Sequence, residues 1–365
     1  MRRVWWAQIK AVTRLELKKT FFAKRGLWIY VVALLPVMLF IAYSIANSTH
    51  IRRSASIAGE SQKQLTYQDL QSVKSGMTKT DLVSRLGKPP LVFHWNQTEG
   101  QGAEKRIIAH EKYHYSDGLN DLYVTMADGK VDGTYLIDGY NLGRDSIMFA
   151  GVFQFFFLRL AVFFGCLGVF MNLFRGEILD RSLHFYFLAP MRREVLMVGK
   201  FLAGLLATSV IFVTSEVLQT VAFLWHVSPA TRDLYLYHNH GLEHAAAYVG
   251  ITVLACIGYG AFFLVAGMVF RNPIIPTAAI LIWEFVNPFL PSLLKQFSVI
   301  YYLKALCPVN IPVPPGMPPL LAMLISNPDP VSVPVALAGL LVVASLALYA
   351  SSLQVRRMEI NYTTE

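Results

Sequence analysis

The apolar run LWIYVVALLPVMLFIAYSIA occupies residues 27–46 and contains no Asp, Glu, Lys or Arg. A helix needs about 20 such residues to cross the roughly 30 Å hydrocarbon core of a bilayer. Residues 1–26 are rich in Lys and Arg, and no small-residue cleavage site follows the run. We therefore interpret residues 27–46 as a retained membrane anchor and not as a cleaved signal peptide.

Five more apolar stretches follow this run, and together they indicate the fold class. Of the 365 residues, 55% are hydrophobic and 15% are charged. This is more apolar surface than one aqueous core readily buries, and it excludes intrinsic disorder. We predict an α-helical polytopic membrane protein with six transmembrane helices. The predicted spans are residues 27–46, 147–173, 200–226, 245–270, 273–291 and 333–354.

The distribution of basic residues predicts the orientation of these spans. With a cytoplasmic N-terminus, the segments on that side hold 16 Lys and Arg against 6 Asp and Glu, while the opposite segments hold 15 of each. Short cytoplasmic loops are enriched in Lys and Arg. Both termini, including the tail at residues 355–365, are therefore predicted to be cytoplasmic. The basic residues that give the net charge of +9 then lie next to the membrane, which favours anionic lipid over nucleic acid as a partner.

Residues 1–26 are predicted to form an amphipathic helix that lies in the headgroup region. Aromatic and aliphatic side chains alternate with cations between Val4 and Phe22. This pattern is typical of interfacial helices. The alternative is a solvated basic leader without regular structure.

Residues 47–146 have the composition of a soluble domain and are predicted to be extracytoplasmic. A short helix is expected to end at Gly76, and residues 78–81 (TKTD) predict a capping box for a second helix that ends at Gly87. Runs rich in aromatic and β-branched residues predict strands at 91–95, 107–115, 122–126 and 131–137. We predict a small α+β domain, with two helices packed on a three- or four-stranded antiparallel sheet.

This domain resembles a known family. Three stretches carry the resemblance: VKSGMTKTDLVSRLGKPP at 73–90, YHY at 113–115 and LYVTMADGKV at 122–131. They look like the SmpA/OmlA domain, which occurs in the small lipoprotein of the outer-membrane β-barrel assembly machine. The resemblance implies a binding or scaffolding module without catalysis. The chain has no lipidated cysteine and holds the domain between two spans, so a role in barrel assembly is not implied.

Residues 174–199, between the second and third predicted spans, are predicted to form an amphipathic cytoplasmic helix. Apolar and charged residues alternate up to Pro190, and the pair Arg192-Arg193 then leads into the third span. On composition alone this segment is a connecting loop. The segment resembles the loop between the second and third spans of type-2 ATP-binding-cassette export permeases. The resemblance lies in the order of its motifs, which is an acidic residue, Arg-Ser-Leu, a hydrophobic run, Pro, a basic pair, Glu-Val and Gly-Lys.

That resemblance implies a coupling helix that contacts a separate ATPase subunit. The expected contact residues are Glu177, Asp180, Arg181, Pro190, Arg192 and Arg193. It also implies a homodimer or heterodimer of permease chains in the inner (plasma) membrane of a bacterium. The sequence contains no Gly-x-x-x-x-Gly-Lys-Ser/Thr phosphate loop, so this chain is expected to have no ATPase site or cofactor of its own. ATP and Mg²⁺ would be bound by the partner ATPase.

Three ionisable residues fall inside the predicted spans: Arg159, Glu216 and Glu284. A charge at the centre of a membrane helix costs about 2.5–3.5 kcal/mol on insertion scales, so these residues should face the bundle interior or water. We expect Arg159 to pair with one of the two carboxylates. The alternatives are a role in a substrate path or gate, and snorkelling to the interface.

Two outer segments carry further motifs. The loop at residues 227–244 contains His238, His240 and His244, which could share a metal ion if the segment is helical. Only Glu243 lies at ligand spacing, so no metal site is expected. Residues 292–332 are rich in proline, and the aromatic stretch at 297–306 is predicted to lie at the outer interface or dip into it. The alternative for this segment is a simple linker.

The leading prediction is a permease subunit that couples ATP hydrolysis by a partner chain to export of a substrate the sequence does not identify. The extracytoplasmic domain would receive that substrate or dock an envelope partner. One alternative is a non-transporting envelope scaffold, in which the spans only anchor the SmpA/OmlA-like domain. A second alternative is a membrane metalloenzyme, although no His-Glu-x-x-His motif occurs in the sequence.

Overall fold

The chain folds into two compact units. We call residues 1–41, 143–223 and 229–365 the helical unit, and residues 42–142 with 224–228 the sheet unit. The computed structural model describes residues 2–22, 26–99, 106–139, 141–179, 186, 188, 191–270, 272–325 and 331–357.

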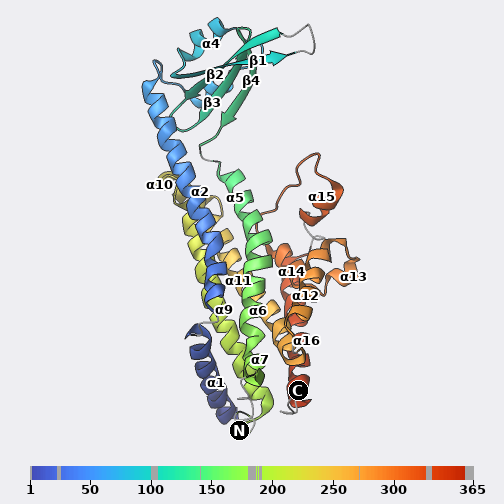
Figure 1. The fold of residues 1–365 in the computed structure, drawn as a ribbon. Helices are drawn as coiled ribbons and strands as arrows, with labels where there is room; N and C mark the ends of the chain where they lie inside the picture. The colour runs from blue at the N-terminus through green and yellow to red at the C-terminus, as the bar shows by residue number, and fades with distance from the viewer. Residues whose placement is uncertain are drawn as a thin grey trace. The chain divides into compact units, whose positions relative to one another are not determined.

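Helices dominate the chain, and Figure 1 labels them in order. One helix, α2 (Leu27–Glu60), starts in the helical unit and ends in the sheet unit. The other helices of the helical unit are α1 (Arg2–Phe22), α5 (Leu142–Gly151), the π-helix η3 (Val152–Val162), α6 (Phe163–Phe170), α7 (Asn172–Leu179), α9 (Arg193–Leu224), α10 (Pro229–His238), α11 (Gly241–Val269), α12 (Ile274–Val286), the 3-10 helix η4 (Asn287–Phe289), α13 (Ser292–Lys295), α14 (Val299–Leu306), α15 (Pro319–Ile325) and α16 (Val333–Arg357).

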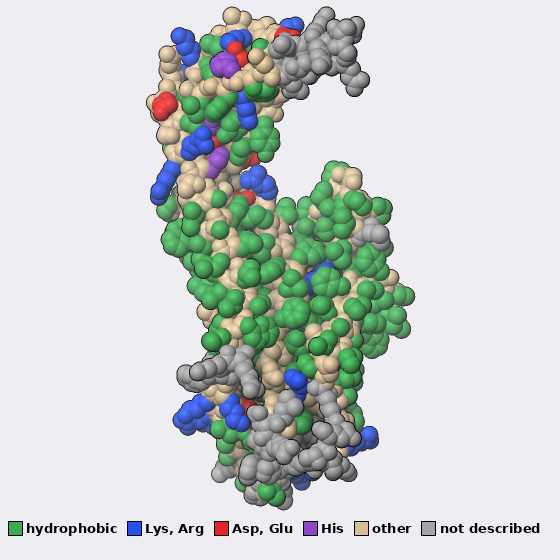
Figure 2. All heavy atoms as spheres, in the orientation of Figure 1, with side chains coloured by type: hydrophobic (Ala, Val, Ile, Leu, Met, Phe, Trp, Pro, Cys, Tyr) green, Lys and Arg blue, Asp and Glu red, His purple; other side chains and the backbone are tan. Residues whose placement is uncertain are grey.

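Five helices in the described part of the chain are long and apolar enough to cross a membrane. They are Leu27–Glu60, Leu142–Ile178, Arg193–Leu224, Gly241–Val269 and Val333–Arg357. Each contains most or all of one predicted span. Hydrophobic side chains cover the middle of the visible face of the helical unit in Figure 2, which is compatible with a bilayer as its solvent.

The predicted fifth span, residues 273–291, differs from the expectation. Its helix α12 has 13 residues and rises only about 20 Å, which is less than the hydrocarbon thickness. Pro288 lies two residues after the end of α12 and within a 3-10 turn, Asn287–Phe289, which ends the helical segment before Pro291. The apolar run therefore forms a helix that is shorter than the hydrocarbon core is thick. In the described part of the chain, five helices and not six are long enough to be spans.

The segment that follows is not a simple linker. The aromatic stretch predicted at the interface forms α14, whose residues Val299 to Lys304 are all buried. It packs against α11, α16 and η3. The amphipathic pattern is thus explained by contact with neighbouring helices of the helical unit.

Small residues allow the helices of this unit to approach closely, as is common in membrane bundles. A Cβ atom added at Gly260 would lie 2.5 Å from the Phe170 ring, and one at Gly267 would lie 2.8 Å from the backbone oxygen of Met171. Helix α11 therefore packs directly on α6 and on the start of α7 through its glycine face.

Replacing Gly267 with alanine is expected to destabilise the helical unit by about 1–3 kcal/mol, because the new methyl group meets backbone atoms that cannot rotate away. Thermal unfolding in detergent would measure the loss. Gly250→Ala on the same helix is the control, since nothing lies within 4 Å of its added Cβ. Equal melting temperatures for the two variants would contradict close packing at Gly267.

The sheet unit contains a four-stranded antiparallel sheet of order β1-β2-β3-β4. Each strand forms at one of the four predicted runs. Their bounds are β1 (Leu91–Glu99), β2 (Arg106–Ser116), β3 (Asp121–Ala127) and β4 (Lys130–Ile137). Two short helices precede them, α3 (Tyr67–Gln71) and α4 (Lys79–Leu86).

Local capping explains where these two helices begin. The Thr66 hydroxyl accepts a hydrogen bond from the Asp69 backbone N–H, and Thr66 N–H donates to the Asp69 carboxylate, which is a complete capping box. At α4, the Thr78 hydroxyl accepts from the Asp81 N–H, which is one of the two bonds of the predicted capping box, and Gly87 ends the helix at φ +85°.

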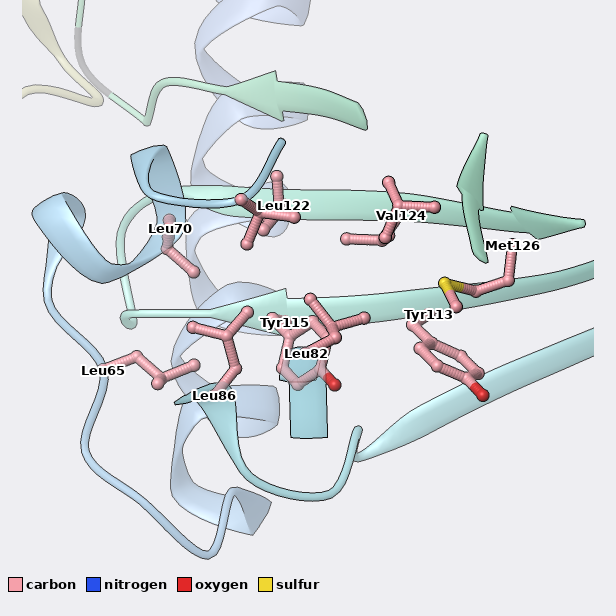
Figure 3. Close-up of a cluster of buried hydrophobic side chains, with 11 residues drawn as sticks. Leu65, Leu70, Leu82, Leu86, Tyr113, Tyr115, Leu122, Val124 and Met126 are labelled. Carbon is pink, nitrogen blue, oxygen red and sulfur yellow. The ribbon is translucent and has the colours of Figure 1, made fainter. Parts of the chain in front are cut away.

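One face of the sheet carries the hydrophobic core of this unit (Figure 3). Tyr113 and Tyr115 lie two positions apart on β2, so both side chains point to this face of the sheet. There they lie in the same cluster as Leu82 and Leu86 of α4. The complete buried set is Leu65, Leu70, Val73, Leu82, Leu86, Tyr113, Tyr115, Leu122, Val124, Met126 and Val131.

The C-terminal half of α2 is tied to the sheet by a buried carboxylate. Asp121 of β3 accepts a hydrogen bond of 2.8 Å from the Ser54 hydroxyl, and its oxygens lie 3.1 Å from His50 Nε2 and 3.4 Å from His114 Nε2. Burial works to raise the pKa of Asp121, but hydrogen bonds from His114 and Ser54 outweigh it and lower that pKa. Asp121 is thus held in its charged form, where it binds α2 to β2 and β3.

Candidate functional site

A buried network of charges joins α1, α7 and α9, and we call it the α1–α7–α9 network. Lys200 of α9 is its centre, with a side chain that is 0% exposed. Its Nζ lies 2.9 Å from Glu16 Oε1 of α1 and 2.8 Å from Glu177 Oε2 of α7, and it donates a 2.8 Å hydrogen bond to the Leu173 carbonyl. One ammonium group therefore holds three helices together.

Two further side chains complete the network. Lys19 Nζ donates to Glu177 Oε1 at 3.1 Å and to the Tyr186 hydroxyl at 2.8 Å. The Tyr186 hydroxyl donates to Glu16 Oε1 at 3.2 Å. The two buried carboxylates are balanced by the buried Lys200 ammonium group and by the exposed Lys19 ammonium group, so the buried charges are paired as burial requires.

The position of Glu16 follows from the geometry of α1. Val12 and Glu16 lie four residues apart and are the buried residues of this helix face. The helix can approach α9 because Gly199 lacks a side chain: an added Cβ would lie 2.9 Å from the Val12 Cβ. Thr13 Oγ1 also donates to the Gly199 carbonyl at 3.1 Å. The only carboxylate within residues 1–26 is thereby placed beside Lys200.

The ionisation of the network follows from its contacts. Burial works to raise the pKa of Glu16, but the neighbouring Lys200 and Lys19 ammonium groups outweigh it and lower the pKa below its usual value. The pKa of Lys19 is raised, because contacts with Tyr186, Glu16 and Glu177 outweigh the opposing effect of burial. Both groups are therefore charged near neutral pH.

Both ends of the predicted coupling segment are fastened to helices. At one end Glu177 belongs to the α1–α7–α9 network. At the other, the Arg192 guanidinium lies over the Trp5 ring of α1, 4.9 Å from its centroid, and Arg193 donates to the Arg356 carbonyl at 3.0 Å. Glu194 forms a 2.6 Å ion pair with Arg356 of α16.

The residues predicted to contact an ATPase therefore differ in their surroundings. Glu177 is buried and faces internal cations, so its role in this structure is to position α7. Arg192 and Arg193 contact α1 and the end of α16. The predicted residues Asp180, Arg181 and Pro190 lie outside the described part of the chain.

The predicted ion pair of Arg159 with a carboxylate is not formed among the described residues. Arg159 is 2% exposed, which excludes snorkelling, and its three guanidinium nitrogens have no described hydrogen-bond partner. Glu216 instead accepts from Thr220 at 3.0 Å. The oxygens of Glu284 accept from Ser298 and the backbone N–H groups at the start of α14, so Glu284 caps that helix.

The three histidines of the predicted loop do not form a metal centre in this structure. His238 ends α10, and His240 precedes α11 and lies 2.9 Å from Glu243, with both side chains exposed. Across the described ranges, no group of three or more His, Cys, Asp or Glu side chains is placed to hold a metal ion.

The centre of the network is not predicted by the sequence patterns. Lys200 starts the predicted span at residues 200–226, Lys19 is one of the cations of the predicted interfacial helix, and neither Glu16 nor Tyr186 is singled out. One signal was present: Glu16 is a single carboxylate among eight Lys and Arg residues, four positions after Val12. Neither the distance to Lys200 nor the closure by Tyr186 can be inferred from spacing.

Comparison with known proteins adds no family assignment to this geometry. No protein-family model, no curated protein and no solved structure matches the chain.

Proposed function

We propose that this chain is the membrane subunit of an ATP-driven exporter, in which a separate ATPase docks on residues 174–199. The observation that carries the proposal is the fastening of both ends of this segment. Through Glu177, Arg192 and Arg193, a displacement of the segment would reach α1, α7, α9 and α16 together. A segment attached in this way can act as a rigid two-state element, which coupling requires.

The topology of the proposal follows the distribution of basic residues. Residues 1–26, the segment at 174–199 and the tail after α16 would face the cytoplasm of a bacterium, where ATP is available. Residues 47–146 would then be extracytoplasmic, and there the sheet unit would receive substrate or an envelope partner. Its edge strand β1 exposes the apolar side chains of Val92, Phe93 and Trp95, which suit a binding surface.

The competing function is a membrane-anchored scaffold that presents the sheet unit. A scaffold needs no partner on residues 174–199 and no ATPase. The α1–α7–α9 network would then only stabilise the bundle. Copurification of an ATPase distinguishes the two functions.

The test is affinity purification of the tagged full chain in mild detergent, with mass spectrometry of the copurified proteins and an ATP hydrolysis assay. We expect a stoichiometric ATPase with the native chain and at least tenfold less with Arg192→Glu/Arg193→Glu, because reversed charges oppose docking. The control is Lys10→Glu/Arg14→Glu, which makes the same charge change at exposed positions of α1. This control should retain the ATPase.

Two results would contradict the proposal. Recovery of envelope proteins without any ATPase, from native and variant chains alike, would favour the scaffold. Equal loss of the ATPase in both double variants would assign the effect to net charge and not to residues 192 and 193. The melting temperature of each variant must be measured beside it, since both arginines have internal contacts.

A further inference from the structure

Glu216 of α9 is a buried carboxyl group in one of the long apolar helices. Its side chain is 1% exposed, and it takes part in none of the ion pairs within the described part of the chain. One oxygen, Oε1, accepts a 3.0 Å hydrogen bond from the Thr220 hydroxyl, while Oε2 has no described partner. An ionised carboxylate in apolar surroundings is costly unless it is paired and hydrogen-bonded. The contacts of Glu216 therefore favour the neutral acid over the carboxylate.

Glu284 of α12, the other carboxyl group in the predicted spans, has different contacts. Its two oxygens accept hydrogen bonds from the Ser298 hydroxyl and from the backbone N–H groups of Val299 and Ile300. Donors at the start of a helix stabilise a negative charge. Glu284 thus has the donors that a charged form needs, and Glu216 has only the Thr220 hydroxyl among the described residues.

Hydrogen bonds fix the orientation of the amide group next to Glu216. The Ser215 hydroxyl donates its single hydrogen to the Ala33 carbonyl of α2. Ser215 Oγ can therefore only accept from Gln219, whose Nε2 lies 3.1 Å away. The amino half of the Gln219 amide faces Ser215, so the other half is the oxygen. Gln219 Oε1 is a buried acceptor without a described donor.

One proton would satisfy both orphaned oxygens. Gln219 lies three positions after Glu216, and side chains at this spacing are neighbours on a helix. Each brings one buried oxygen without a described donor to the same face of α9. Two acceptors cannot bond to each other, but a protonated carboxyl group is a donor. A proton on Glu216 Oε2 therefore converts the two acceptors into a hydrogen-bonding pair.

The neighbouring helices supply no cation to Glu216 among the described residues. Tyr248 of α11 is close enough to interact electrostatically with it, and a phenol is ordinarily neutral near pH 7. Phe149 of α5 packs between Tyr248 and Phe223, with ring centroids 5.2 Å from each. Glu216 also belongs to no group of three described metal-ligating side chains. A proton is thus the cation that these surroundings can accept.

We propose that Glu216 is a proton-binding site of the helical unit, with the proton on Oε2 and donated to Gln219 Oε1. The site is formed by α9 together with its contact to α2. A movement of α9 that gave Glu216 access to water would allow the proton to leave, so the site would link proton release to a change in helix packing. None of its residues lies in the segment at 174–199, so the site stands apart from the identity of the ATPase partner.

The test is infrared difference spectroscopy of the full chain in detergent at neutral pH. A protonated carboxyl group has a carbonyl stretching band that carboxylates lack. We expect this band in the native chain, its loss in Glu216→Gln and its retention in Glu284→Gln, the matched control at the other buried carboxyl group. Glutamine has the shape of the neutral acid and can still donate to Gln219. Absence of the band from the native chain would overturn the proposal, and so would a band that persists unchanged in Glu216→Gln.

A second measurement needs no variant. Dicyclohexylcarbodiimide is an apolar reagent that adds to protonated carboxyl groups and not to carboxylates. After treatment of the native chain in detergent, peptide mapping by mass spectrometry should find the adduct on Glu216, with at least tenfold less on Glu284. Labelling of Glu284 equal to or greater than that of Glu216 would contradict the proposal.

Discussion

Replacement of Lys200 with methionine is expected to destabilise the helical unit by about 3–5 kcal/mol, because it leaves Glu16 and Glu177 buried with too little positive charge. Methionine keeps much of the volume, so the loss reports on charge more than on packing. The free energy of unfolding in detergent, followed by chemical denaturation, would measure it.

The control for this prediction removes one of the two carboxylates as well. Lys200→Met/Glu16→Gln should recover part of the lost free energy, because the 3.1 Å contact between Lys19 and Glu177 remains. If the double variant is as unstable as the single one, the loss comes from the Leu173 hydrogen bond or from packing. Recovery would show that the charges act as one network.

The pH dependence gives an independent readout of the same variant. In the native chain the pKa of Glu16 is lowered from 4.5, so its contribution to stability is complete above pH 4.5 and is lost as the pH falls through the lower folded value. Without Lys200, protonation of Glu16 relieves an uncompensated charge. The difference in unfolding free energy between native and variant should therefore shrink on acidification, and a constant difference would contradict the charge mechanism.

Sequence patterns predicted the elements of this fold better than the contacts between them. Periodicity and length identified the five long apolar helices, since each needs only local information. Residues 273–291 were predicted to span a membrane because they are apolar, but the prolines at 288 and 291 end the helix early. The sheet was predicted well because alternation, capping residues and turns are encoded in short stretches.

The candidate site shows where such patterns stop being informative. Arg159 was expected to pair with Glu216 or Glu284, because each charge alone is costly in a span. In the structure Glu216 accepts one hydrogen bond from Thr220, while its Oε2 atom has no described partner, and Glu284 caps the start of α14. Hydrogen-bond donors four residues away, or at the start of another helix, thus take the place of the guanidinium that the sequence suggests as a partner. Which one is used depends on tertiary geometry.

Replacement of Leu82 with alanine is expected to destabilise the sheet unit by about 2–5 kcal/mol, because Leu82 is 0% exposed at the centre of its core and the change leaves a cavity. Hydrogen exchange of the full chain, measured by mass spectrometry, would show faster exchange in β2 and β3. The control is Val83→Ala, the next residue of α4, which is only half-buried.

The same measurement tests whether the two units unfold separately. The buried residues of the core cluster of the sheet unit lie between Leu65 and Val131, and Leu136 packs against them. If the units are independent, Leu82→Ala should leave exchange in α9 and α11 unchanged while strands β2 and β3 lose protection. Faster exchange in those helices as well would mean that the chain unfolds as one cooperative body. In that case the sheet unit is not a module carried on a membrane bundle, and a function that treats it as a separate docking domain loses its physical basis.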